Sequence, residues 1–223
     1  MDISKINQQL KKNMTINGVI HKRYYHSVEV ADMAVELTKF HKLNIDLEKV
    51  YLAGLLHDAT KLIAKEEQKK MLYRLGYNDD DEIMKSTNVW HGETATLVVK
   101  EEYNIYDVDI LNAIKFHVMG RPQMSDLEKI VFISDYVENT RIGETFEIAR
   151  KLAFKDLDLA LVYILKSQIE YITSQNQPLI SQTLQTYEYY KKGESTLNEW
   201  KSKSSCQYVG KSCHSWYNSV WYA

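Results

Sequence analysis

The spacing of apolar and polar positions along the chain predicts a protein made of helices. Through most of residues 1–192, apolar residues recur at intervals of three and four, and hardly any segment alternates with a period of two. Helices are expected over residues 26–41, 46–58, 65–76, 91–102, 108–117, 125–138, 156–175 and 184–190. Asp46 is a preferred N-cap residue type, and Ser125 with Glu128 has the spacing of a capping box. We therefore predict an all-α single domain over residues 1–192.

The last segment, residues 193–223, has a different pattern. It is rich in Ser, Lys, Trp and Tyr and shows no apolar stripe at helical spacing. Cys206, Cys213 and His214 are metal-ligand types, but their spacing matches no standard zinc pattern. We expect this segment to be an appended or poorly ordered tail.

Composition excludes several classes of protein. The net charge of -2 provides no global field that would attract nucleic acid or an anionic membrane, so any phosphate-binding surface must be local. No segment approaches the roughly 18 apolar residues of a membrane-spanning helix, and the N-terminus lacks the apolar core of a signal peptide. The 8 glycines and 2 prolines are few for a protein of many strands and tight turns. We expect a cytoplasmic protein that binds neither nucleic acid nor membrane.

The stretch "AGLLHDATK", residues 53–61, is an apolar helical run that ends abruptly in His57 and Asp58. Burying an imidazole beside a carboxylate is costly unless something binds them. Other ligand types lie at the ends or on one face of predicted helices, namely His26, His91, His117 and Asp135. Taken singly, each has a structural explanation, as a hydrogen-bonded core histidine or a capping aspartate. Together they indicate a metal site inside the bundle, because facing helices can aim ligands at one point.

The donor set limits the metal. Imidazole nitrogens and carboxylate oxygens suit iron, manganese, cobalt, nickel or zinc, and the main body offers no thiolate because both cysteines lie near the C-terminus. The remaining histidines are not accompanied by other candidate ligands in the sequence. We take these as structural or surface residues, namely His21, His41 and His214.

The order H…HD…D resembles the HD-domain metal phosphohydrolases and, more closely, the YqeK family among them. The resemblance covers about residues 15–192, in the same order throughout, and no ligand position departs from the family pattern. The block from Gly120 to Arg141, together with the WHG motif, makes it specific. It rests on the stretches "RYYHSVEVA" (23–31), "AGLLHDATK" (53–61), "WHGETA" (90–95), "AIKFHVMGRPQMSDLEKIVFISDYVENTR" (113–141) and, weakly, "NQPLI" (176–180).

This resemblance implies an all-helical enzyme that binds iron and splits diadenosine tetraphosphate symmetrically into two ADP. Manganese or cobalt would be the expected substitutes for iron. By the resemblance, the metal ligands are His26, His57, Asp58 and Asp135. His91 and His117 would face the phosphates, act with Asp58 in catalysis and complete a second metal position.

The anionic bridge of such a substrate also needs cations. Arg23 and Lys61 each lie three residues from a predicted ligand, and Arg121 and Arg141 flank the helix that carries Asp135. We expect these four to hold phosphate, against the alternative that they are solvated surface charge. Aromatic residues beside the motifs can stack on adenine, although 16 tyrosines in the chain make them poor discriminators. They are Tyr24, Tyr25 and Tyr136.

Other functions remain compatible with the same site. HD sites share their chemistry, so the substrate can be another nucleotide, such as a nucleoside monophosphate or an alarmone. A regulator that senses nucleotides and retains the metal is a third interpretation, although a complete ligand set argues against it. A helical adaptor without chemistry gives no account of the clustered ligands. The sequence leaves open the oligomeric state, for which a homodimer is one candidate, the physiological metal and the adenine pocket.

Overall fold

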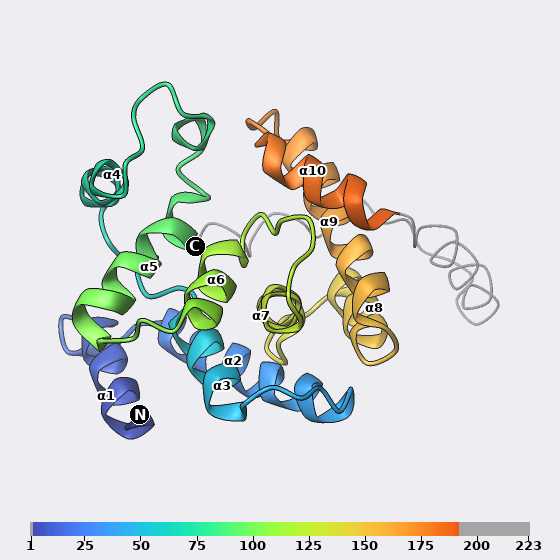
Figure 1. The fold of residues 1–223 in the computed structure, drawn as a ribbon, viewed down its shortest axis with the longest axis horizontal. Coiled ribbons are helices and arrows are strands. Elements are labelled where there is room, and N and C mark those ends of the chain that lie inside the picture. The colour runs from blue at the N-terminus through green and yellow to red at the C-terminus, as the bar shows by residue number, and fades with distance from the viewer. Residues whose placement is uncertain (1, 192–223) are drawn as a thin grey trace.

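The computed structural model describes residues 2–191. The predicted tail with Cys206, Cys213 and His214 lies outside the described residues. About two thirds of the described residues are helical (Figure 1). Its elements are α1 (Ile3–Asn13), β1 (Thr15–Ile16), β2 (Val19–Ile20), α2 (Lys22–Phe40), α3 (Leu47–Leu56), α4 (Lys65–Arg74), the 3-10 helix η1 (Glu82–Lys85), α5 (Trp90–Tyr103), α6 (Val108–Phe116), α7 (Asp126–Val137), α8 (Glu144–Ala153), α9 (Leu157–Ser174) and α10 (Ser181–Tyr190).

The all-α prediction is confirmed, together with three helices and a hairpin that the pattern did not assign. These are α1, α8, η1 and a hairpin in which Thr15 pairs with Ile20 and Ile16 with Val19. The hairpin turns through Asn17 and Gly18, both with positive φ. The 3-10 helix and the two-residue strands are too short to show a period. Within residues 2–191 no helix is long and apolar enough to cross a membrane.

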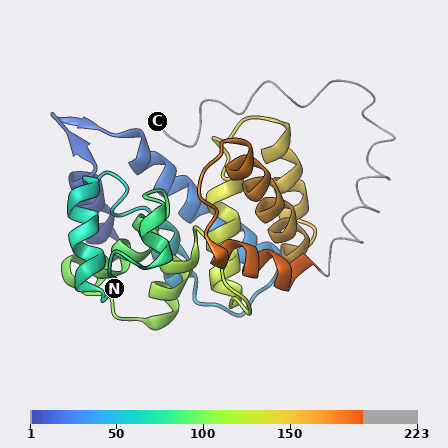
Figure 2. The ribbon, with the colours of Figure 1, turned by 90° about the horizontal axis from the view of Figure 1, so that it is seen from above.

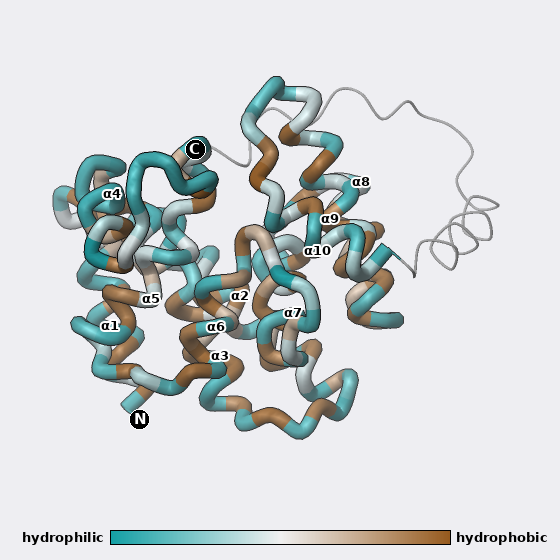
Figure 3. Tube along the Cα trace, turned by 45° about the horizontal axis from the view of Figure 1, so that its top comes forward, coloured by the Kyte–Doolittle hydropathy of each residue, from teal (hydrophilic) through white to brown (hydrophobic). Residues whose placement is uncertain are grey.

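The helices form two flanking groups around a central set. α1, α4 and α5 lie on one side and α8, α9 and α10 on the other, with α7 between them in both views (Figures 1 and 2). α2 packs against α3 and α7, and α6 packs against α5 and α7. Apolar and polar residues follow one another in bands along the helices (Figure 3). The apolar faces pack together into one large core. This central packing brings together the helix ends that carry the predicted ligands.

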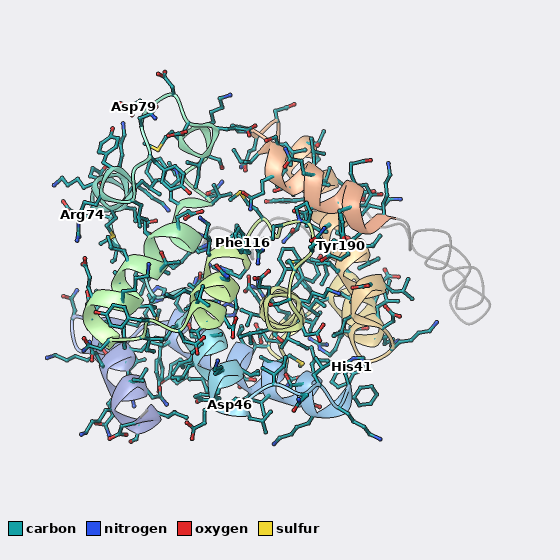
Figure 4. All side chains as sticks on the ribbon, viewed as in Figure 1. His41, Asp46, Arg74, Asp79, Phe116 and Tyr190 are labelled. Atoms are coloured by element: carbon teal, nitrogen blue, oxygen red, sulfur yellow. The ribbon has the colours of Figure 1, made fainter. Side chains whose placement is uncertain are left out.

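Helix ends place the ligand residues. α3 starts after the predicted N-cap, Asp46, whose carboxylate accepts a hydrogen bond from the Glu48 amide. The helix ends at Leu56, so His57 is its C-cap. α6 ends at Phe116, toward the middle of the view in Figure 4, which makes the next residue, His117, the C-cap. The expected helices 46–58 and 108–117 are therefore slightly shorter than predicted. Both cap residues keep right-handed helical backbone angles, and their side chains are buried in the interior.

The predicted capping box is present at the start of α7, where the side chains of Ser125 and Glu128 each bond the other's backbone amide. α7 then runs through Asp135 and ends at Val137, with Glu138 as its C-cap. This helix is buried on most of its surface. Its last turn therefore presents Asp135 and Glu138 to the same interior region as the ends of α3 and α6.

Two glycines allow close helix packing beside the ligands. A Cβ on Gly54 of α3 would lie 2.7 Å from the Ala31 Cα of α2. A Cβ on Gly92 of α5 would lie 2.8 Å from the Lys115 carbonyl oxygen of α6. Real Cβ atoms do not approach backbone this closely, so glycine is required by contact at both positions. The adjoining ligands are thereby held at fixed separations.

Candidate metal centre

Four of the predicted ligands converge on one buried point from three elements. The His26 Nε2 of α2 lies 3.0 Å from Asp135 Oδ1 of α7. The His57 Nε2 at the end of α3 lies 3.7 Å from the same oxygen and 3.6 Å from Asp58 Oδ2. Ligand atoms of His26, His57 and Asp58 all lie within 4.8 Å of one another. This arrangement can hold one metal ion.

A second group shares Asp58. Its other oxygen, Oδ1, lies 3.4 Å from His91 Nε2 and 3.8 Å from His117 Nε2. The two imidazole nitrogens are 3.2 Å apart. These three residues form a further set within ligand distance, and all are buried. The structure thus places all six predicted ligand residues in one continuous cluster, with the Asp58 carboxylate between its two halves.

The tautomers of two histidines are fixed by their own helices. His57 Nδ1 lies 2.6 Å from the Gly54 carbonyl oxygen, and His117 Nδ1 lies 2.6 Å from the Ile114 carbonyl oxygen. A carbonyl only accepts hydrogen bonds, so Nδ1 carries the proton and Nε2 presents its lone pair to the cluster. His57 Nε2 is fully buried and has no hydrogen-bond partner. A buried lone pair of this kind fits a metal ion as its partner.

His26 is oriented by a carboxylate that the sequence analysis did not assign. Its Nδ1 donates to Glu138 Oε1 at 3.3 Å, and Glu138 is itself held by the amide and hydroxyl of Thr140. Burial lowers the pKa of His26, but the carboxylates of Asp135 and Glu138 outweigh burial and raise it. A carboxylate behind a ligating histidine is the usual outer partner of such sites.

The carboxylates of the cluster are held in their charged form. Burial opposes charge on Asp58, but His57 and Lys61 outweigh it and hold the pKa of Asp58 well below its ordinary value. Burial likewise opposes charge on Asp135, but the neighbouring His26 and His57 imidazoles outweigh it and hold the pKa of Asp135 well below its ordinary value. Both groups are therefore carboxylates at neutral pH, the form that binds a cation.

The two histidines of the second group are held neutral. Burial, with Lys61 nearby, lowers the pKa of His91 well below its ordinary value. Burial and the neighbouring His57 lower the pKa of His117 to about 4. Neutral imidazole is the form that ligates metal. The buried electrostatics therefore prepare both halves of the cluster for a cation.

Three of the predicted cations lie against the cluster. An Arg23 nitrogen lies 3.0 Å from Asp58 Oδ2, Lys61 Nζ lies 3.2 Å from His91 Nε2, and Arg141 Nη2 lies 3.4 Å from Asp135 Oδ1. Arg121 is placed differently. Its guanidinium makes two bonds to Glu128, at 2.9 and 2.6 Å, and it is not among the residues that line the cavity beside the cluster.

That cavity has a volume of about 310 Å³. Asp58, His91, His117 and Asp135 line it together with Arg23, Lys61 and Arg141. Other parts of its wall come from α9, the segment that leads into α10 and the start of α10. The sequence predicted helices there but indicated no role in the site, apart from the weak "NQPLI" match. Those residues include Gln168, Tyr171, Ile172, Gln177, Pro178 and Thr183. The site thus combines a charged, metal-suited wall with a mixed polar and apolar wall.

Positions of the other candidates vary. Tyr136 lines the cavity, and so does His21, which the sequence analysis set aside as structural. Tyr24 and Tyr25 are not among the lining residues. His41 lies elsewhere, with its Nε2 2.7 Å from the Ala153 carbonyl oxygen. Lys65 also lines the cavity, and no sequence motif pointed to it.

Known protein families show to which class of protein the chain belongs. The family model described as "HD domain" matches residues 23–140, a segment that contains all six predicted ligand residues. The chain therefore belongs to the HD-domain family, whose members are metal-dependent phosphohydrolases.

Individual relatives narrow the class to the YqeK family, as the sequence motifs predicted. The chain is 33% identical to "Bis(5'-nucleosyl)-tetraphosphatase, symmetrical" of Bacillus subtilis, over 77% of this chain and 90% of that protein. It is 34% identical to the protein of the same name from Halalkalibacterium halodurans, over 84% and 96%. A crystal structure described as a "predicted HD superfamily hydrolase involved in NAD metabolism", from Clostridium acetobutylicum, matches with a TM-score of 0.78 and 34% identity, over 85% of this chain and 97% of that one.

Proposed function

We propose that this protein hydrolyses diadenosine tetraphosphate symmetrically into two ADP, using a bound metal ion. The observation that carries the proposal is the buried His and Asp cluster beside a cavity lined by Arg23, Lys61 and Arg141. Relatives that align over 90% or more of their own length are named for the same reaction. The complete ligand set favours turnover over a role in sensing nucleotides.

Iron is the metal we propose, held by His26, His57, Asp58 and Asp135, with a second ion near His91 and His117. Manganese or cobalt would substitute, because nitrogen and oxygen ligands suit all three metals. When bound, such an ion lowers the pKa of a coordinated water and polarises a phosphoryl oxygen. The orphaned Nε2 of His57 and the charged Asp58 and Asp135 are the features that support this assignment.

The chain's own residues supply binding and proton handling. Arg23, Lys61 and Arg141 neutralise the anionic bridge and hold the inner phosphorus atoms beside the cluster. Asp58, a buried carboxylate, orients the attacking water and accepts its proton. The water oxygen bonds to one inner phosphorus, and the oxygen between the two inner phosphorus atoms departs with the other ADP. Each half of the substrate thus keeps two phosphates.

Product analysis tests the proposal. Protein loaded anaerobically with iron, and in parallel with manganese or cobalt, is incubated with diadenosine tetraphosphate, and the nucleotides are resolved by ion-exchange chromatography. We expect ADP as the single product, because attack at an inner phosphorus divides the bridge evenly. The variant His57→Ala serves as the metal-free control.

Three results would contradict the proposal. Equal amounts of ATP and AMP would mean attack at an outer phosphorus. Faster turnover of a nucleoside monophosphate or an alarmone would assign the site to another nucleotide. Tight nucleotide binding without cleavage in any of the three metal forms would favour the regulator.

A further inference from the structure

Lys65, the first residue of α4, lies on the cavity wall beyond the proposed phosphate ligands. Its ammonium donates to the Thr87 carbonyl oxygen at 2.9 Å, and its side chain is half-buried. No carboxylate within residues 2–191 pairs with it. The other lysines of α4 differ, since Lys69 lies 2.7 Å from Asp79 and Lys70 lies 2.6 Å from Glu67. Lys65 therefore brings an uncompensated charge to the cavity.

That charge is placed where it is unfavourable in the absence of an anion. Burial, followed by repulsion from Lys61, lowers the pKa of Lys65. Four cations line the cavity, Arg23, Lys61, Lys65 and Arg141, against the two carboxylates Asp58 and Asp135. Both carboxylates belong to the metal cluster. A polyanionic ligand is the partner that this surplus of positive charge fits.

His21 adds a directed donor to the same cavity. It is the N-cap of α2, and its Nδ1 accepts the Arg23 amide at 3.1 Å. Because Nδ1 accepts, the ring proton sits on Nε2. The ring lines the cavity together with Lys65. His21 therefore offers an N–H donor to a ligand in the cavity.

Within residues 2–191, Lys65 and His21 line the cavity without a hydrogen bond or ion pair to a proposed metal ligand, whereas Arg23 bonds Asp58. Lys61 contacts the ligand His91 directly, whereas Lys65, four residues later, bonds the loop before α5. A symmetric cut puts two phosphates on each side of the broken bond. The inner cations serve the half next to the metal, so the other half needs its own donors.

We propose that Lys65 and His21 form an outer phosphate subsite, which holds the phosphates of the departing nucleoside diphosphate half. This inference rests on the proposed function, because it divides that substrate between an inner and an outer site. Such a subsite makes a two-nucleotide substrate bind more tightly than one nucleoside diphosphate. It also stabilises the negative charge that grows on the departing half.

Equilibrium binding to the full metal-loaded chain tests the inference. The probes are diadenosine tetraphosphate with a methylene group in place of the central bridging oxygen, which cannot be cleaved there, and ADP. In Lys65→Gln we expect the affinity for the analogue to fall about 10- to 150-fold, the range for loss of one charge-assisted hydrogen bond. The affinity for ADP, which occupies the inner half, should change less than about 3-fold.

Two further variants complete the design. Lys70→Gln, on the exposed face of the same helix, is the matched control and should leave both affinities unchanged. His21→Asn keeps a short side chain that can cap α2 but removes the imidazole, and should weaken the analogue selectively. Circular dichroism of each variant reports on folding.

The outcomes separate this inference from the proposed function. Lys65→Gln and Lys70→Gln with equal affinity for the analogue would overturn it, and so would equal weakening of the analogue and ADP, which would place Lys65 in the inner half. A wild-type chain that binds the analogue no more tightly than ADP would also overturn it. Turnover of diadenosine tetraphosphate by the wild-type chain, assayed separately, reports on the proposed function alone.

Discussion

At the scale of single residues, each histidine of the first ligand group is aimed by a bond on its far side. The Gly54 carbonyl oxygen fixes the ring of His57, and the Glu138 carboxylate fixes that of His26. The Ile114 carbonyl oxygen does the same for His117 in the second group. These bonds leave Nε2 of each ring facing the cluster. The rings are therefore positioned by the fold before any ion binds.

Removal of one ligand should abolish tight metal binding while the protein stays folded. In His57→Ala or Asp58→Ala the site loses a direct ligand, whereas the apolar core is untouched. Elemental analysis of the purified variants measures the metal, and circular dichroism measures the helix content. Wild-type metal stoichiometry in both variants would refute the ligand assignment.

Replacement of Glu138 by Gln should weaken metal binding without removing a ligand. The amide oxygen still accepts from His26 Nδ1, but it lacks the charge that makes the ring a stronger donor to the metal. We expect metal affinity to fall about 10- to 100-fold, the usual cost of losing an outer-shell partner. Competition with a chelator measures the affinity, and Glu147→Gln, at an exposed position of α8, is the control. Equal affinities in the two variants would mean that Glu138 is only structural.

At the scale of elements, the site depends on how closely α2 approaches α3. The added methyl of Gly54→Ala would meet the Ala31 backbone at 2.7 Å, and backbone cannot yield as a flexible side chain does. Overpacking costs about 1 to 3 kcal/mol, while the helix propensity of Ala returns about 1.

We expect Gly54→Ala to lower the free energy of unfolding by up to about 2 kcal/mol. Metal affinity should fall with it, because the two helices carry His26 and His57. Urea unfolding and chelator competition measure the two effects. Glu48→Ala, on the exposed side of α3, should stay within about 0.5 kcal/mol of wild type. A Gly54→Ala protein of wild-type stability would show that the helices separate at no cost.

At the scale of the whole molecule, the cluster ties together five helices. His26 comes from α2, the His57–Asp58 pair from the end of α3, His91 from α5, His117 from the end of α6 and Asp135 from α7. An ion bound among them favours the folded state over the unfolded chain, in which these ligands are far apart.

Metal at 100 times its dissociation constant should therefore raise the melting temperature by about 5 to 10 °C. Calorimetry with and without a chelator checks this, and His57→Ala should show no difference between the two conditions. A chelator that leaves the wild-type melting temperature unchanged would mean that the ion does not bridge the helices.

The sequence by itself determined the local features. Helical periodicity, the capping box of Ser125 and the Asp46 cap are set by residues within one or two turns, so they are visible in the pattern. The ligand types were visible as well, because His57 and Asp58 interrupt an apolar run that would otherwise continue. α1 and α8 were missed, although they are no shorter than α3 and α6, which were predicted.

Tertiary structure alone decided which of these residues meet. Glu138 bonds the far side of the His26 ring, 112 positions away in the sequence. Lys65, at the start of α4, lines the cavity. Arg121 has the same type and sequence neighbourhood as the cations at the cluster, yet Glu128 holds it elsewhere. Spacing fixes neighbours along one helix, whereas the partner of a side chain across the bundle depends on how the helices pack. The packing follows from buried contacts spread over the whole core, which no short stretch of sequence contains.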